Sequence, residues 1–248
     1  MKQTQRLDKI LAHMGIGTRS ELKRLTKGGA ILVNGVKVKD SGMQVNPDTD
    51  LITVNGDPVV YREFVYLMMN KPQGVVSATE DNRDRTVVDL LDSAYSPFDV
   101  FPVGRLDKDT EGFLLLTNDG KLAHNLLSPR KHVPKTYFAK VEWEVGEADR
   151  AAFAQGVILD DGYETLPGTL TILSVGSESV GQPSEIELTI MEGKFHQVKR
   201  MFQAVGKTVV YLKRISMGPL TLDESLALGD SRELREDELI ALRNAHEV

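Results

Sequence analysis

The side chains of this chain that are best suited to chemistry lie in a short loop between two apolar runs. Gly104 and Gly112 bound the loop, Arg105 and Asp107 stand two positions apart within it, and the apolar run 113–116 follows. Such a loop can hold one carboxylate against a protein interior, where it can act as a nucleophile or a base. By composition alone, the same loop also fits an ordinary solvated turn.

A partly buried carboxylate that works at neutral pH needs a cation close to it. Residues 192–202 offer one, because their apolar side chains gather on one helical face while His196, Lys199 and Arg200 spread over the opposite side. The apolar face of this segment can pack against the rest of the protein, and the basic face can bind. An amphipathic surface helix without a function would show the same pattern.

Several motifs, taken together, resemble one known family. The strings GRLD-x-x-T-x-G at 104–112, K-T-Y at 135–137 and G-K-F-H-Q-V-K-R-M at 193–201 resemble motifs of the RNA pseudouridine synthases of the RluA and RsuA types. The string N-K-P-x-G at 70–74 resembles their opening motif. Lys199 stands where the RluA branch usually has Arg, so the resemblance is to the RsuA branch, and it covers nearly the whole chain.

The resemblance implies a role for each matching position. Asp107 would be the catalytic carboxylate, Lys199 would pair with it, and Tyr137 would lie against the uracil and accept the proton from C5. Arg105 would enter the space left by the flipped nucleotide, and Lys71 would shape the site. The residues expected to contact the substrate RNA are Arg19, Lys23, Arg24, Lys27, Lys71, Arg105, Lys135 and Arg200.

The implied reaction converts uridine to pseudouridine. The N1–C1′ bond breaks, the uracil turns, and C5 joins C1′, so neither a redox change nor an energy source is needed and we expect no cofactor. The histidines lack H-x-x-x-H spacing and neighbouring acids in ligand register, so we also expect no metal. Asp107 could act by covalent attack or by removing a sugar proton to give a glycal, and the sequence leaves both routes open.

Residues 1–58 are predicted to form a separate small domain. Apolar side chains between positions 7 and 14 follow helical spacing, the string T-R-S-E at 18–21 reads as a capping box, and Asn34-Gly35 predicts a hairpin turn. The segment resembles the S4 RNA-binding domain over residues 5–55. Without that resemblance, it would read equally well as a small α+β module with basic, solvated faces.

Residues 59–63 are predicted to be a linker, and residues 64–248 a larger catalytic domain. We expect strands at 64–69, 100–103, 113–117, 136–145, 168–174, 185–191 and 208–214, and helices near 87–91, 121–127, 150–155, 197–205 and 236–244. Because helices fall between only some of the strands, the pattern indicates an α+β domain around a mixed, mainly antiparallel sheet.

The formal net charge is −6, yet the basic residues are clustered. Residues 1–39 contain nine Lys or Arg against two acids, and residues 120–141 and 193–222 contain no acid. Attraction between charges at the surface acts within a Debye length of roughly 8–10 Å, so local basic patches can attract RNA despite an acidic total.

Cysteine is absent, which excludes disulfides and cysteine-bound zinc. No apolar run approaches the roughly 20 residues of a membrane span, and the first residues lead into an amphipathic helix instead of a signal peptide. We therefore expect a cytoplasmic protein.

Together these features predict an RsuA-type ribosomal RNA pseudouridine synthase that works as a monomer in ribosome biogenesis. The segments V-G-R-L-D-K-D-T-E-G and L-K-R-I-S-M-G-P-L look most like those of enzymes that modify small-subunit (16S) rRNA. Two alternatives stay open: a synthase acting on 23S rRNA, and a non-catalytic RNA-binding or ribosome-assembly factor that has kept the fold.

Overall fold

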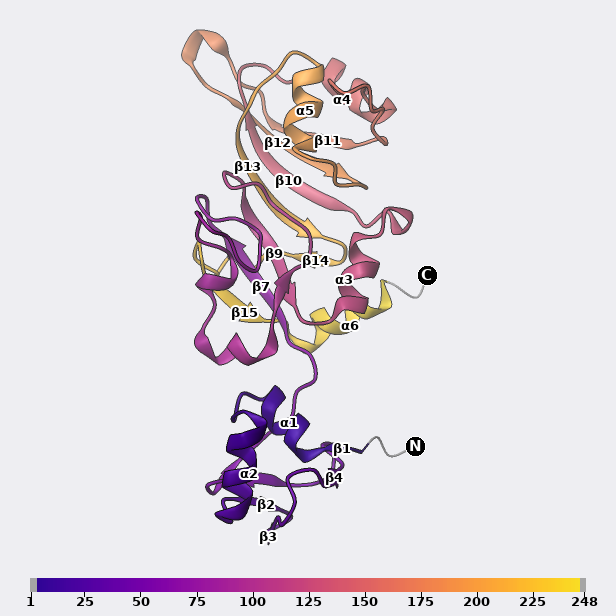
Figure 1. The fold of residues 1–248 in the computed structure, drawn as a ribbon. Coiled ribbons are helices and arrows are strands. Elements are labelled where there is room, and N and C mark those ends of the chain that lie inside the picture. Colours follow the sequence, from indigo (N-terminus) through magenta and orange to yellow (C-terminus); the bar gives the residue numbers. More distant parts are fainter. Residues whose placement is uncertain (1–3, 246–248) are drawn as a thin grey trace. The chain divides into compact units, whose positions relative to one another are not determined.

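The computed structural model describes residues 4–245 and contains two compact units (Figure 1). Unit 1 comprises Met1–Val65 and Asp92–Val100, and unit 2 comprises Tyr66–Leu91 and Phe101–Val248. Residues 1–3 and 246–248, the outer ends of the two predicted domains, lie outside the described residues. The two units are described in turn.

Among the described residues, unit 1 has two α-helices and two small antiparallel sheets. Its elements are β1 (Gln5–Arg6), α1 (Leu7–His13), α2 (Arg19–Lys27), β2 (Ile31–Val33), β3 (Val36–Lys37), β4 (Gln44–Val45), β5 (Ile52–Val54), β6 (Asp57–Pro58) and the 3₁₀-helix η2 (Ser93–Phe98). The strands pair in the orders β1-β4 and β3-β2-β5-β6. Leu7 and Leu11 of α1 are buried in one core with Ile31 and Ile52, which is the reason for their helical spacing.

Two local predictions in unit 1 are confirmed. Thr18 caps α2, because its hydroxyl accepts from the Glu21 amide while the Glu21 carboxylate accepts from the Thr18 amide at 2.7 Å. Asn34 and Gly35, with φ of 52° and 78°, form the turn between β2 and β3. Residues 59–63, predicted as a linker, belong to unit 1, where Val59 and Tyr61 pack against the core.

Residues 92–100 also belong to unit 1, although they follow a segment of unit 2 in the chain. The Phe98 ring packs edge-on against the His13 ring with 5.4 Å between centroids, and the Arg62 guanidinium lies 5.2 Å from the Phe98 ring centre. These partners are far from Phe98 in sequence, so no local pattern indicates this association.

Unit 2 is built on one nine-stranded sheet whose main order is β11-β12-β10-β13-β9-β7-β15, with β14 paired to β13 and β8 paired to β9. The strands are β7 (Tyr66–Lys71), β8 (Phe101–Pro102), β9 (Glu111–Thr117), β10 (Lys135–Val141), β11 (Thr169–Ser174), β12 (Ser184–Ile190), β13 (Val209–Met217), β14 (Leu220–Thr221) and β15 (Ser231–Glu233). Within the described part of the sheet, only β13 and β9 pair in parallel. The predicted mixed, mainly antiparallel sheet is therefore confirmed.

Four α-helices of unit 2 fall in stretches that were predicted to be helical. The helices are α3 (Gly120–Leu127), α4 (Glu147–Gln155), α5 (Gln197–Ala204), α6 (Glu236–Asn244), and the 3₁₀-helices η1 (Val88–Leu90), η3 (Pro129–Lys131) and η4 (Glu178–Val180). In Figure 1, α4 and α5 lie together beside β11 and β12, and their rings Phe153 and Phe202 meet edge-to-face with 4.9 Å between centroids. Helices α3 and α6 contribute Leu122 and Leu242 to the core around Phe113.

The burial of β9 explains its unbroken apolar run. Residues 113–116 are all buried, on both faces of the strand, so apolar side chains do not alternate with polar ones. Strands β10 and β12 alternate between buried and partly buried positions, as strands with one covered face do. The short polar strand β15 was not predicted, because its position depends on pairing with β7.

Gly112 stands where β9 meets β13, opposite Arg214 in the parallel pair. Its φ is +103°, and a Cβ at this position would overlap the Arg214 carbonyl oxygen and lie 3.0 Å from the Arg214 amide nitrogen. Only glycine permits this close approach of two backbones.

We predict that Gly112→Ala destabilises unit 2 by about 2 kcal/mol more than Gly74→Ala. Gly74 is a matched control, because its φ is +86° but nothing lies within 4 Å of a Cβ built there, so alanine meets backbone strain without overlap. The measurement is the free energy of unfolding in urea for both variants. Equal losses would show that the approach of β9 and β13 does not require glycine.

Candidate active site

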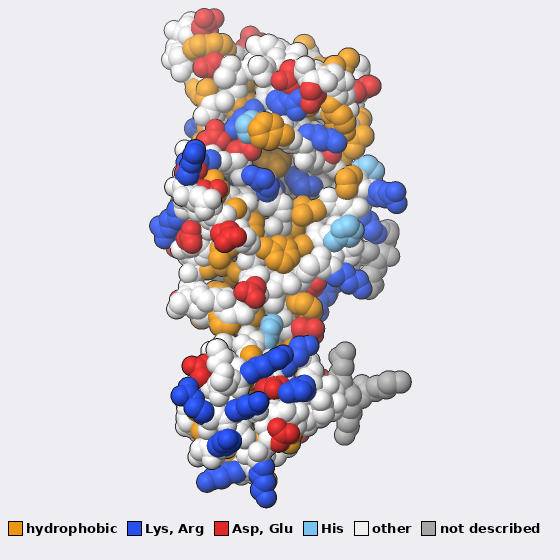
Figure 2. All heavy atoms as spheres, viewed as in Figure 1, with side chains coloured by type: hydrophobic (Ala, Val, Ile, Leu, Met, Phe, Trp, Pro, Cys, Tyr) orange, Lys and Arg blue, Asp and Glu red, His pale blue; other side chains and the backbone are white. Residues whose placement is uncertain are grey.

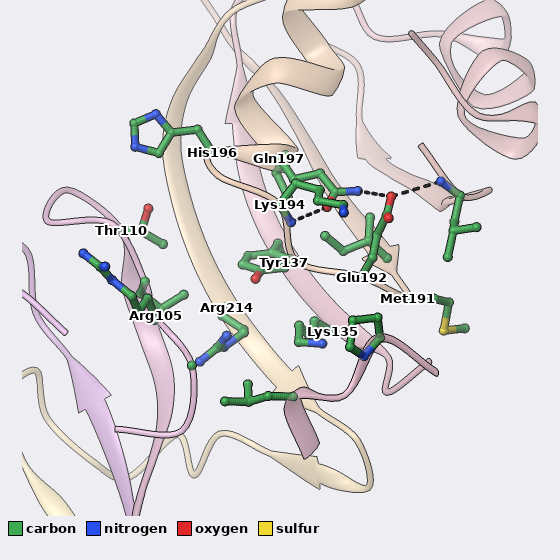
Figure 3. Close-up of a pocket in the computed structure, with 18 of the residues that line it drawn as sticks. Arg105, Thr110, Lys135, Tyr137, Met191, Glu192, Lys194, His196, Gln197 and Arg214 are labelled. Atoms are coloured by element: carbon green, nitrogen blue, oxygen red, sulfur yellow. Dashed lines mark hydrogen bonds between the residues drawn. The ribbon is translucent and has the colours of Figure 1, made fainter. Parts of the chain in front are cut away.

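A cavity of about 420 Å³ opens in unit 2, a volume typical of small-ligand sites (Figure 3). The cavity is lined by the loop around Asp107, by β10 and β13, and by the segment that leads into α5. Four of the predicted site residues line it, namely Arg105, Asp107, Lys135 and Tyr137.

One row of paired residues crosses four neighbouring strands at this site, and two of its members, Tyr137 and Arg214, line the cavity. Lys71 on β7 is opposite Gly112 on β9, Gly112 is opposite Arg214 on β13, and Arg214 is opposite Tyr137 on β10. Hydrogen bonding between strands therefore brings together residues that are widely separated in the chain.

Lys71 anchors the loop that carries Asp107. Its side chain is fully buried, and Nζ donates to the carbonyl oxygens of Pro72, Asp107 and Thr110 at 2.9–3.0 Å. Burial lowers the pKa of Lys71 to about 8, and the negative charges of nearby acids oppose that shift. At neutral pH the ammonium form therefore predominates, with all three of its N–H groups engaged.

Ser77 and Gly74 also hold the backbone of the loop that carries Asp107. Ser77 exchanges hydrogen bonds with Leu106, accepting from its amide and donating to its carbonyl, both at 3.0 Å. The Gly74 amide donates to the Lys108 carbonyl at 2.8 Å. The backbone on both sides of Asp107 is thus held by residues 71–77, at the end of β7 and just after it, a stretch that overlaps the N-K-P-x-G string.

The structure brings Asp107 and Lys199 together, as predicted. Lys199 Nζ lies 3.2 Å from Asp107 Oδ2 and 2.7 Å from Asp109 Oδ1, so one ammonium bridges two carboxylates. Burial acts to lower the pKa of Lys199, but its hydrogen bonds with Asp109 and Asp107 outweigh burial and raise it. The hydrogen bond from Lys199 lowers the pKa of Asp109. The Asp107 side chain keeps 26% of its surface exposed, so it can still meet a ligand.

His196 also faces Asp107, with Nε2 3.4 Å from Oδ1, a contact that sequence reasoning missed. The residue precedes α5 and has a left-handed backbone, φ 49°. Its ring stacks on the exposed Phe195 with 3.7 Å between centroids. This backbone conformation directs His196 toward the Asp107 loop at the point where α5 begins.

Glu192 organises the segment that leads into α5. Oε1 accepts from the Leu166 amide at 3.0 Å and from Gln197 Nε2 at 2.7 Å, while Oε2 accepts from the Tyr163 hydroxyl at 2.6 Å. Gln197 in turn accepts from the Lys194 amide at 2.8 Å (Figure 3). Glu192 is buried and both of its oxygens are occupied, so we assign it a structural role.

Lys135 and Tyr137 lie on one face of β10, because side chains two positions apart point the same way. Both are buried and both line the cavity. Lys135 Nζ donates to the Val133 carbonyl at 3.0 Å, and burial followed by repulsion from Arg214 lowers its pKa to about 8. The K-T-Y string therefore contributes a cation and a phenol to the part of the cavity lined by Lys135, Tyr137 and Arg214, which we call the floor.

Arg214 is a cavity residue that sequence reasoning did not single out. The residue is 2% exposed, Nε donates to the Phe113 carbonyl at 2.8 Å, and Nη2 is buried without a hydrogen-bond partner. An arginine in a predicted strand, inside an acid-free stretch, was the available clue. That clue could not reveal that the opposite strand residue is Tyr137.

Three residues predicted to contact RNA have different surroundings. Arg105 is exposed at the cavity and makes no hydrogen bond or ion pair with any residue from 4 to 245. Lys71 is a correction, because its buried ammonium is fully engaged by backbone carbonyls and has no surface for direct RNA contact. Arg200 pairs with Asp160 and Asp161 outside the cavity lining.

The cations predicted for RNA docking in unit 1 lie on one helix. Arg19, Lys23 and Arg24 are exposed on α2, as is Lys27 at its end. Figure 2 shows blue side chains gathered over unit 1. Arg24 has a long 4.0 Å contact with Glu21, so this face keeps most of its positive charge available.

Within the described part of the chain, no group of three or more His, Asp or Glu side chains is placed to hold a metal ion. His246 lies outside that part. None of the described helices is long and apolar enough to cross a membrane.

Comparisons with known proteins match both units. A family model described as RNA pseudouridylate synthase matches residues 65–204, and an S4 domain model matches residues 5–52. The chain is 56% identical to the uncharacterized RNA pseudouridine synthase YtzG of Bacillus subtilis, over 94% of this chain and 96% of that protein. It is 41% identical to ribosomal large subunit pseudouridine synthase B of the same species, over 96% of each chain.

Two more matches cover similar lengths. Ribosomal small subunit pseudouridine synthase A of Salmonella typhimurium is 38% identical over 96% of this chain and 99% of that protein. A solved structure titled crystal structure of pseudouridylate synthase superposes with a TM-score of 0.66 at 36% identity, covering 96% of this chain and 99% of that one.

Lys135 makes stability depend on pH. Its pKa of about 8 in the folded protein lies below the ordinary 10.5, so between these values the unfolded chain binds more protons and its side chain adds stability as pH rises. We predict that the free energy of unfolding of wild type minus that of Lys135→Met increases from pH 8 to 10.5, by at most about 1.4 kcal/mol per pH unit. Urea unfolding at several pH values measures it, and a flat difference would contradict the shift.

Proposed function

Because this chain belongs to the RNA pseudouridine synthase family, in its RsuA-type branch with an S4 domain, we propose that it isomerises a uridine of ribosomal RNA to pseudouridine at Asp107. The observation that carries the proposal is the partly exposed Asp107 carboxylate in a cavity, held 3.2 Å from Lys199 on a loop anchored by Lys71. A structural ion pair would not need an adjoining cavity of this size.

Lys199 places its positive charge 3.2 Å from the Asp107 carboxylate, the group that acts in both chemical routes. In one route the carboxylate attacks the substrate, and in the other it removes the C2′ proton of the ribose so that a glycal forms. In either route the electron pair of the N1–C1′ bond leaves with the uracil. After the ring turns, C5 bonds to C1′ while the carboxylate is released in the first route, or while C2′ regains its proton in the second. C5 then loses its proton and N1 gains one, so the atoms of substrate and product balance.

Tyr137 and Arg105 have complementary positions for this reaction. Tyr137 is buried in the cavity, where its ring can lie against the uracil, and its hydroxyl oxygen is our candidate acceptor for the C5 proton. Arg105 is exposed and lines the same cavity. Its side chain can therefore enter the stack that the flipped nucleotide leaves, offsetting part of the cost of unstacking.

We propose small-subunit (16S) rRNA as the substrate, acted on in the cytoplasm by a monomer. The support is the resemblance of residues 103–112 and 212–220 to the corresponding segments of small-subunit enzymes. The alternative is 23S rRNA, since the relatives described above include enzymes named for either subunit. Mapping pseudouridine in both rRNAs from a strain that lacks this protein decides between them.

We predict that Asp107→Asn lowers the rate of tritium release from C5-labelled rRNA at least about 1,000-fold, because the amide can neither attack nor accept a proton. Asp84→Asn is the matched control, since Asp84 pairs with Lys108 of the same loop at 2.6 Å but does not line the cavity. The control should keep its activity. Equal release by wild type and Asp107→Asn would refute the proposed role, and no release by wild type would favour a non-catalytic factor.

The α2 face gives a separate prediction about RNA binding. Lys23 and Lys27 are exposed one helical turn apart, so Lys23→Gln/Lys27→Gln should reduce the slope of log affinity against log salt by up to about 0.9 for each phosphate that is no longer neutralised. The control is Lys140→Gln/Arg150→Gln, which removes two cations of unit 2 that pair with Glu185 and Glu147. Filter binding over a salt series measures the slope for each double variant. If the α2 variant and the control variant had the same slope, docking through α2 would be excluded.

A further inference from the structure

Arg214 has hydrogen-bonding capacity that the protein does not use. Nε donates to the Phe113 carbonyl, but Nη2 is buried without a partner, and no carboxylate among residues 4–245 pairs with the guanidinium. A buried charge without a counter-charge costs several kcal/mol. Such a group is usually retained for a ligand that supplies the missing acceptor.

The acids of the same cavity are already engaged elsewhere. Glu192 accepts from Leu166, Gln197 and Tyr163, and Asp107 faces Lys199 and His196. Neither carboxylate is therefore free to neutralise Arg214.

Lys135 adds to the excess of positive charge beside Arg214. It is buried, and its one hydrogen bond to the described protein goes to a neutral carbonyl. Figure 3 shows Lys135, Tyr137 and Arg214 grouped on β10 and β13. Among the described residues, the floor thus holds two neighbouring cations and no acid to neutralise them.

The depth of these residues indicates which part of a nucleotide reaches them. Asp107 and Lys199 each expose 26% of their side chains, whereas Arg214 is almost completely buried. The ribose must stay near Asp107 for chemistry, and its phosphates continue into the RNA chain outside the cavity. The part that can extend to the floor is therefore the uracil ring.

We propose that Arg214, assisted by Lys135, donates hydrogen bonds to a carbonyl oxygen of the uracil and stabilises the negative charge that the ring gains when the N1–C1′ bond breaks. The bond's electron pair moves to N1 and is shared with the ring oxygens, where a guanidinium N–H can meet it. The charge disappears when C5 has bonded to C1′ and N1 takes up a proton. This role rests on the proposed function, because only that reaction releases an anionic uracil.

The test measures tritium release in a single turnover, with enzyme at a saturating concentration and in excess over the rRNA, together with RNA affinity. Arg214→Gln should lower the rate constant about 100-fold and leave affinity nearly unchanged, as expected for a group that acts mainly on charge developing in the transition state. Arg150→Gln is the control for the same substitution, on the exposed side of α4. In Arg214→Ala, guanidinium ion should restore part of the rate, whereas sodium at equal ionic strength and neutral urea should not.

The outcomes separate this role from others. Unchanged rate in Arg214→Gln overturns it, as does weaker RNA binding with a normal rate, which would indicate a phosphate contact, or equal rescue of Arg214→Ala by sodium or urea. If Arg214→Gln fails to fold, Arg214→Lys decides: a reduced rate at unchanged affinity supports the role, and a wild-type rate overturns it. An inactive wild type would instead refute the proposed function itself.

Discussion

The close backbone contact between β9 and β13 at Gly112 is the constraint on which the site depends. It is the parallel junction within a sheet whose other described pairs are antiparallel, and it sets Arg214 directly beside the end of the Asp107 loop. Lys71, on the opposite side of Gly112, holds the same loop by its backbone carbonyls. A shift of one residue in this register would move each of these groups to the other face of the sheet.

Charge is distributed unevenly in and around the cavity. Toward solvent, two carboxylates share one ammonium, and on the floor two cations have no acid of their own among the described residues. Both arrangements are held by backbone hydrogen bonds or by strand pairing, so little reorganisation is needed when a charged ligand enters. Preorganised charge of this kind is more effective for catalysis than the same groups on mobile loops.

Much of the fold could be predicted from local patterns. The capping box at Thr18, the Asn34-Gly35 turn and the apolar run of β9 each depend on residues near one another in sequence, and each was predicted. The site was only partly predictable. The pairing of Asp107 with Lys199 came from family motifs, whereas the unpaired state of Arg214 depends on which strands become neighbours, which no local pattern encodes.

The cavity lies wholly in unit 2, while the exposed cations of α2 belong to unit 1. If α2 docks RNA as proposed, the covalent connection makes capture of the target uridine an intramolecular event, governed by an effective concentration instead of a second affinity. The cavity then need not bind RNA tightly on its own. Such a division lets the modified nucleotide leave the site while the RNA is still attached, and it allows target choice to change through the docking surface without altering the chemistry.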